Sequence, residues 1–217
     1  MTAPEHDGPT RSLEIERKYD VDATAVLPDW ERLPGVAEVV GPERRELDAR
    51  YFDTVDGRLA QAATALRRRT GGPDAGWHIK QATPEGKLET HWPLGDSGSD
   101  SGSGDPVVPA EIVAELAGVA APPFTAIARI RNARDAYALI DAAGGIIAEF
   151  VDDHVTATDV RRGVETVWRE WELELGPVAP ASDAERAALF AEADRLVAAA
   201  GGCPAASASK LGRALGA

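Results

Sequence analysis

Five short stretches of this chain carry charged side chains at every second position. Their charged members are Glu14, Glu16 and Lys18; Arg67 and Arg69; His78 and Lys80; Lys87 and Glu89; and Glu170, Glu172 and Glu174. Side chains at alternate positions of a β-strand share one face, so each run predicts a strand with a charged face. Like charges at this spacing repel one another unless a counter-ion lies between them. The pattern therefore points to a site that binds ions.

For any single strand, a sheet with one solvated face explains the alternation equally well. Three features of the whole set favour another interpretation. The polar positions are almost all charged, like charges are neighbours, and acidic and basic strands are separated along the chain. A closed barrel with its charged face inward and its apolar face covered by helices accounts for all three. The alternative is a barrel without a ligand, in which Arg67 and Arg69 are only ion-pair partners of Glu89 or Glu170.

The two signs of charge predict two kinds of ligand inside such a barrel. The basic strands would hold a highly charged anion. The glutamate-rich strands would hold Mg²⁺ or Mn²⁺, because these ions are bound by a few carboxylates together with substrate phosphates. The sequence contains no GxxxxGK[ST] loop, no HExxH motif and no cysteine cluster, and its four histidines are dispersed.

The remaining elements follow from periodicity and turn residues. Strands are expected at 13–19, 46–54, 64–70, 76–82, 87–94, 125–132, 136–141, 146–153 and 164–175. Helices are expected at 22–33, 109–118 and 182–200, with a final helical turn within 207–215. We expect a flexible tail at 1–11 and one domain over 12–217. The Gly/Ser-rich stretch 95–106 is interpreted as a flexible insertion, the alternative being a linker between two half-domains.

Composition excludes several classes of protein. The 217 residues include 23 Lys and Arg and 36 Asp and Glu, so the net charge is −13. Such a surface repels nucleic acid and anionic membranes, and we expect neither as a partner. A single cysteine excludes an internal disulfide, and no apolar run reaches the roughly 18 residues of a membrane span. A cytoplasmic location is expected, and the choice between monomer and homodimer stays open.

The motif Glu14-Ile15-Glu16-Arg17-Lys18 resembles the ExExK signature of the CYTH superfamily, the triphosphate tunnel metalloenzymes. Further stretches resemble motifs of that family in the same order. These are YFDT at 51–54, LRRR at 66–69, IK at 79–80, KLE at 87–89, RIR at 129–131, VDD at 151–153, EWELEL at 170–175 and SKLGR at 209–213. The matches span 13–213, which is nearly the whole chain.

The resemblance implies an α+β fold: a closed eight-stranded antiparallel β-barrel, the triphosphate tunnel, with helices packed outside. It also implies roles for individual residues. The metal ligands would be Glu14, Glu16, Asp153, Glu170, Glu172 and Glu174. The phosphate-binding cations would be Lys18, Arg67, Arg69, Lys80, Lys87, Arg129, Arg131, Lys210 and Arg213, with Arg134 a weaker candidate. Catalysis would involve Glu16, Lys18, Asp153 and Glu172, and either Glu172 or Asp153 could accept the proton of the attacking water.

Strand parity places Asp153 rather than Asp152 in the tunnel, and a one-residue bulge would reverse that choice. The aromatic residues Trp77, Trp92, Trp171, Tyr19 and Tyr51 are expected to pack in the core. His91 is in phase with Glu89 and either lines the tunnel or lies at its rim.

The reaction implied is metal-dependent hydrolysis of a triphosphate. We expect inorganic triphosphate as the substrate, because the inward positions that the sequence identifies are charged and no aromatic set faces inward. Thiamine triphosphate hydrolysis and cyclisation of ATP on the same scaffold are the alternatives. A non-catalytic module that binds polyphosphate or nucleotides is a further one, although a pure anion binder has no need for so many carboxylates.

Overall fold

A computed structural model describes residues 8–94 and 105–216 of the chain. The expected tail at 1–11 therefore lies largely outside the described residues. The same holds for the expected insertion at 95–106, of which Asp105 and Pro106 are described. Within the described part, no helix is long and apolar enough to cross a membrane.

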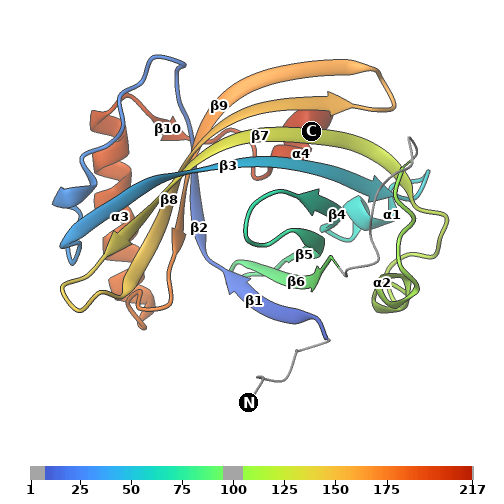
Figure 1. The fold of residues 1–217 in the computed structure, drawn as a ribbon, viewed down its shortest axis with the longest axis horizontal. Coiled ribbons are helices and arrows are strands. Elements are labelled where there is room, and N and C mark those ends of the chain that lie inside the picture. The colour runs from blue at the N-terminus through green and yellow to red at the C-terminus, as the bar shows by residue number, and fades with distance from the viewer. Residues whose placement is uncertain (1–7, 95–104, 217) are drawn as a thin grey trace.

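The fold is built on one antiparallel sheet of ten strands. They are β1 (Thr10–Glu14), β2 (Glu16–Asp20), β3 (Glu38–Asp53), β4 (Thr64–Thr70), β5 (Gly76–Ala82), β6 (Lys87–Pro93), β7 (Thr125–Ile140), β8 (Ile146–Asp159), β9 (Val164–Leu175) and β10 (Cys203–Pro204). Their order is β1-β6-β5-β4-β3-β7-β8-β9-β2-β10. The long strands β3, β7 and β9 arch over β4, β5 and β6, so the sheet is strongly curled (Figure 1).

The expected closed ring of eight strands is modified at the N-terminal segment. The predicted strand 13–19 is two strands, and they pair with different neighbours: β1 with β6 and β2 with β9. Among the described residues no hydrogen-bonded ladder joins β1 to β10, the two ends of the sheet. The chain itself spans the gap, because only Ile15 separates β1 from β2. The ring is thus completed by covalent backbone rather than by a ladder.

Most predicted strands form, and two of them merge. The segments 125–132 and 136–141 are one continuous strand, β7, and β3 and β8 extend beyond the predicted 46–54 and 146–153. The long partners explain the extension, because β7 pairs with β3 on one side and β8 on the other over nearly its whole length. Pairing therefore carries the strands through residues whose own alternation is weak.

Five short or medium helical elements accompany the sheet. They are the 3-10 turn η1 (Trp30–Arg32) and the helices α1 (Arg58–Gln61), α2 (Ala110–Glu115), α3 (Asp183–Ala199) and α4 (Lys210–Leu215). The predicted helix at 22–33 is wrong: only η1 forms there. Pro28 disfavours a helix interior, and the Arg169 guanidinium donates hydrogen bonds to the carbonyls of Asp22, Ala23 and Ala25, which fixes this segment as a loop.

Helices cover the outer face of the sheet, as expected. Helix α3 begins at Ser182, whose hydroxyl accepts a hydrogen bond from the Glu185 backbone N–H. Its apolar side joins a core with Tyr19 and Trp171. A second core packs α1 and α2 against Trp77 and Trp92. The prediction that these aromatic residues are core residues is confirmed.

Helix α4 is different, because it packs against β7 and β8 and several of its side chains line the interior cavity. Ser209 caps its first turn by accepting a hydrogen bond from the Gly212 N–H. The cap fixes the start of the helix at Lys210 and so determines where that side chain enters the interior.

Candidate active site

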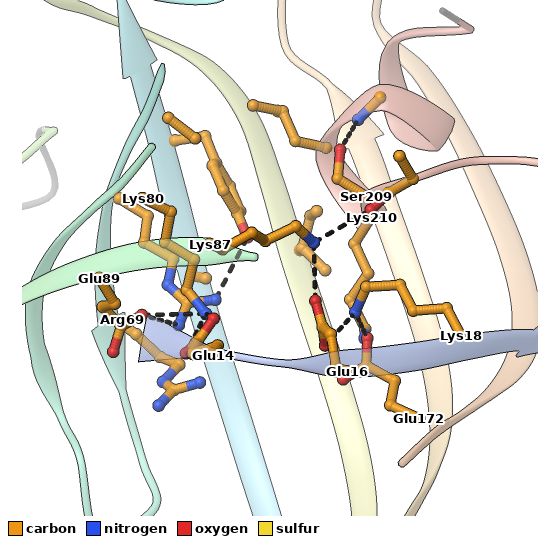
Figure 2. A pocket seen from close by; sticks show the side chains of 18 of the residues that line it. Glu14, Glu16, Lys18, Arg69, Lys80, Lys87, Glu89, Glu172, Ser209 and Lys210 are labelled. Carbon is orange, nitrogen blue, oxygen red and sulfur yellow. Dashed lines mark hydrogen bonds and ion pairs between the residues drawn. The ribbon is translucent and has the colours of Figure 1, made fainter. Parts of the chain in front are cut away.

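A cavity of about 840 Å³ lies inside the curled sheet. Strands β1 to β9 and helix α4 all contribute side chains to its surface. Figure 2 shows Lys80 and Arg69 near Glu14 and Glu89, and Lys18, Lys87 and Lys210 near Glu16 and Glu172. Most residues of the charged strand faces that the sequence predicted to point inward line this cavity, with His78 and Glu170 as exceptions.

A cluster of carboxylates lies at one side of the cavity: Glu172 lines it, and Asp153 and Glu170 are buried next to the cavity-lining Lys210. Asp153 on β8 lies opposite Glu170 on β9, and Glu172 follows two residues later. One carboxylate oxygen of each lies within 4.8 Å of the others. We call these three residues the carboxylate wall. Asp152 faces the other side of the sheet, where it accepts hydrogen bonds from Arg169 and Trp171.

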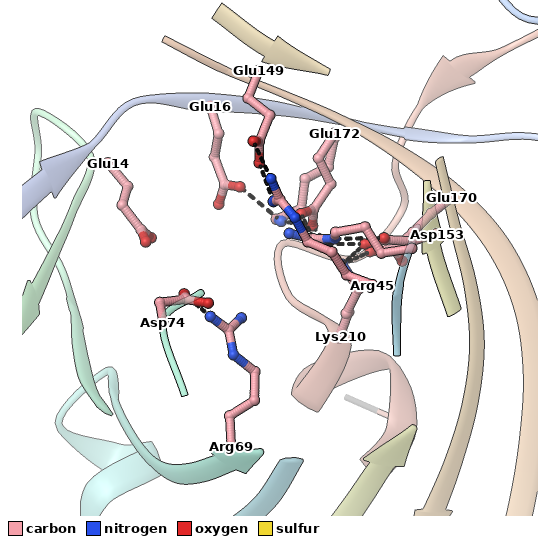
Figure 3. A network of polar contacts seen from close by, with 12 residues as sticks. Glu14, Glu16, Arg45, Arg69, Asp74, Glu149, Asp153, Glu170, Glu172 and Lys210 are labelled. Atoms are coloured by element: carbon pink, nitrogen blue, oxygen red, sulfur yellow. Dashed lines mark hydrogen bonds and ion pairs between the residues drawn. The ribbon is translucent and has the colours of Figure 1, made fainter. Parts of the chain in front are cut away.

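The Lys210 ammonium lies among these carboxylates (Figure 3). Its Nζ is 2.8 Å from Asp153, 2.6 Å from Glu170 and 2.7 Å from Glu172. Burial alone lowers the pKa of Lys210, but the three carboxylates outweigh it and raise the pKa above its usual range. Lys210 is therefore a fully charged ammonium at the centre of the carboxylate wall.

Two further cations neutralise the same wall. Arg134 donates a bidentate pair of hydrogen bonds to Asp153, at 2.8 and 2.7 Å, and a further one to Glu172 at 3.1 Å. Lys18 forms an ion pair with Glu172 and, at 2.9 Å, with Glu16. Burial raises the pKa of Asp153, yet Lys210 and Arg134 outweigh it and bring that pKa to about 2. Lys18, Lys210 and Arg134 likewise outweigh burial at Glu172 and hold its pKa well below its usual range, so Asp153 and Glu172 are ionised at physiological pH.

The remaining predicted acidic residues lie on the cavity surface but outside this cluster. Glu14 accepts hydrogen bonds from Lys80 at 2.7 and 2.6 Å, and Glu16 accepts one from Lys87 at 2.7 Å. Glu174 lies opposite Glu16 in the β2–β9 ladder. Burial, followed by the nearby charge of Glu14, raises the pKa of Glu174 to about 7.

The facing side of the cavity is basic. Arg67 and Arg69 on β4 and Lys80 on β5 form what we call the cationic wall. Its counter-charges are Glu14, 2.6 Å from Lys80; Glu89, 2.9 Å from Lys80 and 3.5 Å from Arg67; and Asp74, which forms an ion pair with Arg69.

This wall keeps unused hydrogen-bond donors, although its three cations have three acidic partners. The Nε atoms of Arg67 and Arg69 are buried and have no hydrogen-bond partner among the described residues. Burial and then the charges of Arg67 and Arg134 lower the pKa of Arg69 to about 9. An anion entering the cavity would supply the missing acceptors.

His78 supports the cationic wall from behind. Its side chain is fully buried, its Nδ1 lies 3.2 Å from Glu89, and its ring stacks on His91 with centroids 4.6 Å apart. Burial, despite the hydrogen bond to Glu89 and reinforced by Arg67 and Arg69, lowers the pKa of His78 to about 3. The imidazole is therefore neutral at physiological pH. The alternatives weighed for His91, the tunnel lining or the rim, give way to this stacked position.

Three residues of the predicted phosphate-binding set lie away from the cavity. Arg129 pairs with Asp48 and Arg131 with Glu165 on the opposite face of β7, and both are about half exposed. Arg213 forms an ion pair with Asp20 and lies over the Trp168 ring at 4.9 Å. The placement predicted for them is therefore corrected.

A β-bulge explains the error on β7. Tyr51 pairs with Ala128 but Phe52 pairs with Ala126, so Ile127 is an extra residue in the ladder. With this insertion, cavity-facing positions are Ile127, Ile130, Asn132 and Arg134. The RIR motif at 129–131, from which the roles of these two arginines were predicted, therefore presents both of them on the face away from the cavity.

Four cavity residues were missed or undervalued in the sequence. Arg134 was only a weaker candidate; Arg45, Asn132 and Tyr51 were not assigned to the site. Tyr51 packs in a hydrophobic core, as expected, and it also lines the cavity, where its hydroxyl accepts a long hydrogen bond of 3.5 Å from Arg67. Strand alternation could have identified these residues if it had been counted along β3 and, in β7, from the residues C-terminal to the bulge. Arg45 bonds Glu149 at 3.1 Å across the cavity end (Figure 3).

The carboxylate wall fits a divalent metal ion. Three hard oxygen donors within 4.8 Å of one another match the ligands that Mg²⁺ and Mn²⁺ prefer. The Glu170 Oε1 atom is buried and has no hydrogen-bond partner among the described residues, although Lys210 lies within ion-pair distance. The ammonium position and the metal position overlap, so a bound ion would require Lys210 to move.

Comparison with known proteins agrees with this geometry. The family model of the CYTH domain matches residues 12–194. The chain belongs to the CYTH family. Members of this family bind small molecules that contain a triphosphate, are metal-dependent and are often triphosphatases or cyclases.

Solved structures share the CYTH fold at low sequence identity. A candidate adenylate cyclase of Bacillus halodurans has a TM-score of 0.60 and 21% identity, over 94% of this chain and 97% of that one. HpAC1 of Hippeastrum, a candidate adenylyl cyclase described as having a dominant triphosphatase activity, has a TM-score of 0.51 and 18% identity, over 94% and 96% of the two chains. These likenesses concern the fold alone.

A much closer relative in sequence is the uncharacterized protein Rv2226 of Mycobacterium tuberculosis H37Rv. It is 42% identical over 221 residues, which cover 96% of this chain and 41% of the relative. The chain thus spans about two-fifths of the length of this curated relative.

Proposed function

We propose that this CYTH domain catalyses metal-dependent hydrolysis of a triphosphate. The observation that carries the proposal is a single cavity in which buried, incompletely paired arginines face a cluster of three carboxylates. In the reaction, a water oxygen forms a bond to the terminal phosphorus while the bond from that phosphorus to the bridging oxygen breaks. The products are orthophosphate and the diphosphate-bearing remainder, with release of a proton.

The cationic wall binds the phosphate chain in this proposal. Arg67 and Arg69 offer the planar donors that suit phosphate oxygens, and Lys80 adds a point charge beside them. Lys18 and Lys87 lie between the two walls, where they reach the same chain of phosphates. Fixed cations in a buried cavity stabilise the charge that spreads over the phosphoryl group during transfer.

Asp153, Glu170 and Glu172 would hold the metal ion, with Glu14, Glu16 and Glu174 on the adjoining surface. A bound divalent ion neutralises phosphate charge and lowers the pKa of a bound water. Lys210, displaced from the carboxylates, would contribute its ammonium to the phosphates. Glu172 and Asp153 stay the proposed acceptors of the water proton, because both are ionised and lie at the carboxylate wall.

The test is phosphate release from inorganic triphosphate, thiamine triphosphate and ATP in the presence of Mg²⁺ or Mn²⁺. We expect release that is abolished by EDTA and in Glu16→Gln, which keeps the side-chain shape and removes its charge. Circular dichroism of the variant serves as the folding control. Full activity of folded Glu16→Gln would overturn the assignment of Glu16, and release that persists in EDTA would overturn metal dependence.

A parallel assay for cyclic AMP tests the cyclase alternative on the same samples. Binding of triphosphate without any turnover, measured by calorimetry with and without Mn²⁺, would support the non-catalytic module instead. The charged inward positions favour inorganic triphosphate as the substrate. Another part of the cavity surface, however, is apolar.

A further inference from the structure

The wall formed by β3 and β7 is apolar where the other walls are charged. Between Arg45 and Arg134 at one end and Tyr51 at the other, its cavity-facing residues are largely aliphatic. Helix α4 adds two leucines beside them. The residues are Leu47, Ala49, Ile127, Ile130, Leu211 and Leu215, and we call them the apolar strip.

The apolar strip belongs to the proposed active-site cavity itself. Ala49 pairs with Arg69 on one side and with Ile130 on the other, so charged and apolar surfaces meet within one ladder step. The volume of about 840 Å³ lies high in the range of roughly 300–1,000 Å³ typical of cavities that enclose drug-sized organic ligands. An inorganic triphosphate, which is far smaller and has no apolar surface, would leave this part unused.

One polar side chain interrupts the strip. Asn132 lies between Ile130 and Arg134 on β7 and is only 5% exposed. Its Oδ1 is buried and has no hydrogen-bond partner among the described residues. A buried carbonyl oxygen without a donor is unfavourable, so a ligand that brings an N–H or O–H group to this point gains from pairing with it.

Other polar groups near the strip already have protein partners. Tyr51 contacts Arg67, and the buried Asp53 accepts hydrogen bonds from the backbone N–H groups of Thr54, Leu59 and Ala60. Asn132 is thus the one side chain near the strip, among the described residues, that the structure records as a buried acceptor without a donor. A nucleobase carries several donors and acceptors, and the strip would leave most of them unpaired.

We propose that the preferred substrate is an organic triphosphate ester whose organic group is apolar, seats on the apolar strip and donates one hydrogen bond to Asn132. This inference rests on the proposed triphosphate hydrolysis and specifies its substrate class. The phosphates bind the cationic wall while the hydrocarbon part lies against Ile127, Ile130 and the α4 leucines. Hydrolysis then releases orthophosphate and the diphosphate ester.

The first experiment compares phosphate release, with Mn²⁺, from inorganic triphosphate, ATP, hexyl triphosphate and 2-hydroxyhexyl triphosphate. Burial of a methylene is worth about 0.8 kcal/mol, or roughly fourfold, so two buried methylenes raise kcat/KM by more than tenfold. We expect hexyl triphosphate to exceed inorganic triphosphate and ATP by at least tenfold in kcat/KM, and the hydroxyl to add a further gain.

Two variants tie these preferences to residues. Ile130→Ala should lower the ratio of kcat/KM for hexyl triphosphate to that for inorganic triphosphate by at least fivefold. Val155→Ala, in the same apolar cluster but not lining the cavity, is the matched control and should leave the ratio unchanged. Asn132→Leu should remove the gain from the hydroxyl while hexyl triphosphate is still cleaved.

The outcomes distinguish a failure of the proposed triphosphate hydrolysis from a failure of the inferred substrate class. Release from none of the four compounds by the folded protein would overturn the proposed function and this inference with it. Release that is fastest from inorganic triphosphate or from ATP would overturn the inference and leave triphosphate hydrolysis standing. A ratio unaffected by Ile130→Ala, or equal changes in Val155→Ala, would also overturn it.

Discussion

The two charged walls of the cavity differ in how completely their charges are paired. On the carboxylate wall, Lys210, Arg134 and Lys18 all lie within ion-pair distance of Glu172. On the cationic wall, the Nε atoms of Arg67 and Arg69 have no acceptor among the described residues. The carboxylate wall therefore holds internal cations that a metal ion would have to replace, whereas two arginines of the cationic wall keep donors without an acceptor. One wall exchanges a partner on binding, and the other gains one.

The largest expected effect concerns the internal cation of the carboxylate wall. Lys210→Met keeps the length of the side chain but leaves Asp153, Glu170 and Glu172 short of one positive charge. Breaking a buried ion pair in this way costs about 3–5 kcal/mol of folding stability. We expect thermal unfolding without metal to shift down accordingly, and Mn²⁺ to restore more stability than it adds to the wild type.

Lys87→Met is the matched control for that comparison. Lys87 contacts Glu16 and the carbonyl of Ala208 and is 27% exposed in its side chain. It should lose much less stability and show the wild-type response to Mn²⁺. If Lys210→Met responds to Mn²⁺ no more than the wild type does, the ammonium and metal positions do not overlap.

A comparably large effect on activity is expected at the cationic wall. Arg69→Met removes a phosphate donor, and loss of one such donor typically reduces rate by about 10²–10³-fold. Since burial and neighbouring cations already lower the pKa of Arg69 to about 9, the folded protein should lose little or no stability. Steady-state kinetics and thermal unfolding of the same sample check both parts. An inactive variant that is also strongly destabilised would indicate a structural role instead.

A smaller effect is expected on the pH dependence of folding stability, and it arises at the cationic wall alone. The pKa of His78, behind the cationic wall, is about 3 in the folded protein against about 6.5 unfolded. As the pH falls below 6.5, His78 becomes protonated in the unfolded chain but stays neutral in the folded protein. The free energy of unfolding therefore decreases. At pH 5 the loss is about 2 kcal/mol.

Urea unfolding at pH 7 and pH 5 measures this loss. The groups facing His78 are Glu89 and His91 on β6, Arg67 and Arg69 on β4, and both the carboxylate and the backbone carbonyl of Asp74. His78→Asn should flatten the pH dependence relative to the wild type. His154→Gln, on the exposed outer side, should keep the wild-type slope. Equal slopes in wild type and His78→Asn would contradict the assignment.

The smallest effect is expected on the outer face of β7. Arg129 and Asp48 form a partly exposed pair, and such pairs contribute about 0–1 kcal/mol. Arg129→Met should therefore change kcat/KM by less than threefold and leave the unfolding temperature nearly unchanged. A loss as large as that of Arg69→Met would show that Arg129 reaches the phosphates and that the assigned face of β7 is wrong.

The sequence revealed the inward charged faces because alternation survives wherever a strand is regular. Glu14, Glu16, Lys18, Arg67, Arg69 and Lys80 all face the cavity as parity predicted. Parity failed at Ile127, where an extra residue in the ladder changes the face of everything beyond it. No residue type marks that bulge, since it arises from pairing between β3 and β7.

Other features depend on contacts far apart in sequence. The loop at 22–33 is fixed by Arg169, which local propensity does not record. The apolar strip combines residues of β3, β7 and α4. In each element alone, these apolar residues predict only packing in a hydrophobic core. Lys210 was selected from a motif, but its position among three carboxylates depends on the cap that starts α4 at Ser209.

The division of the N-terminal segment into β1 and β2 has a consequence for the order of folding. Residues 16–20 pair with 170–174, and Asp20 also pairs with Arg213. Residues 16–20 must therefore wait for strands and a helix that are synthesised well after them. Long-range closure of this kind slows folding because loop entropy is lost before the contacts form. Until then Glu16 and Lys18 are separated from Glu172, so the nascent chain has a sheet but no assembled site.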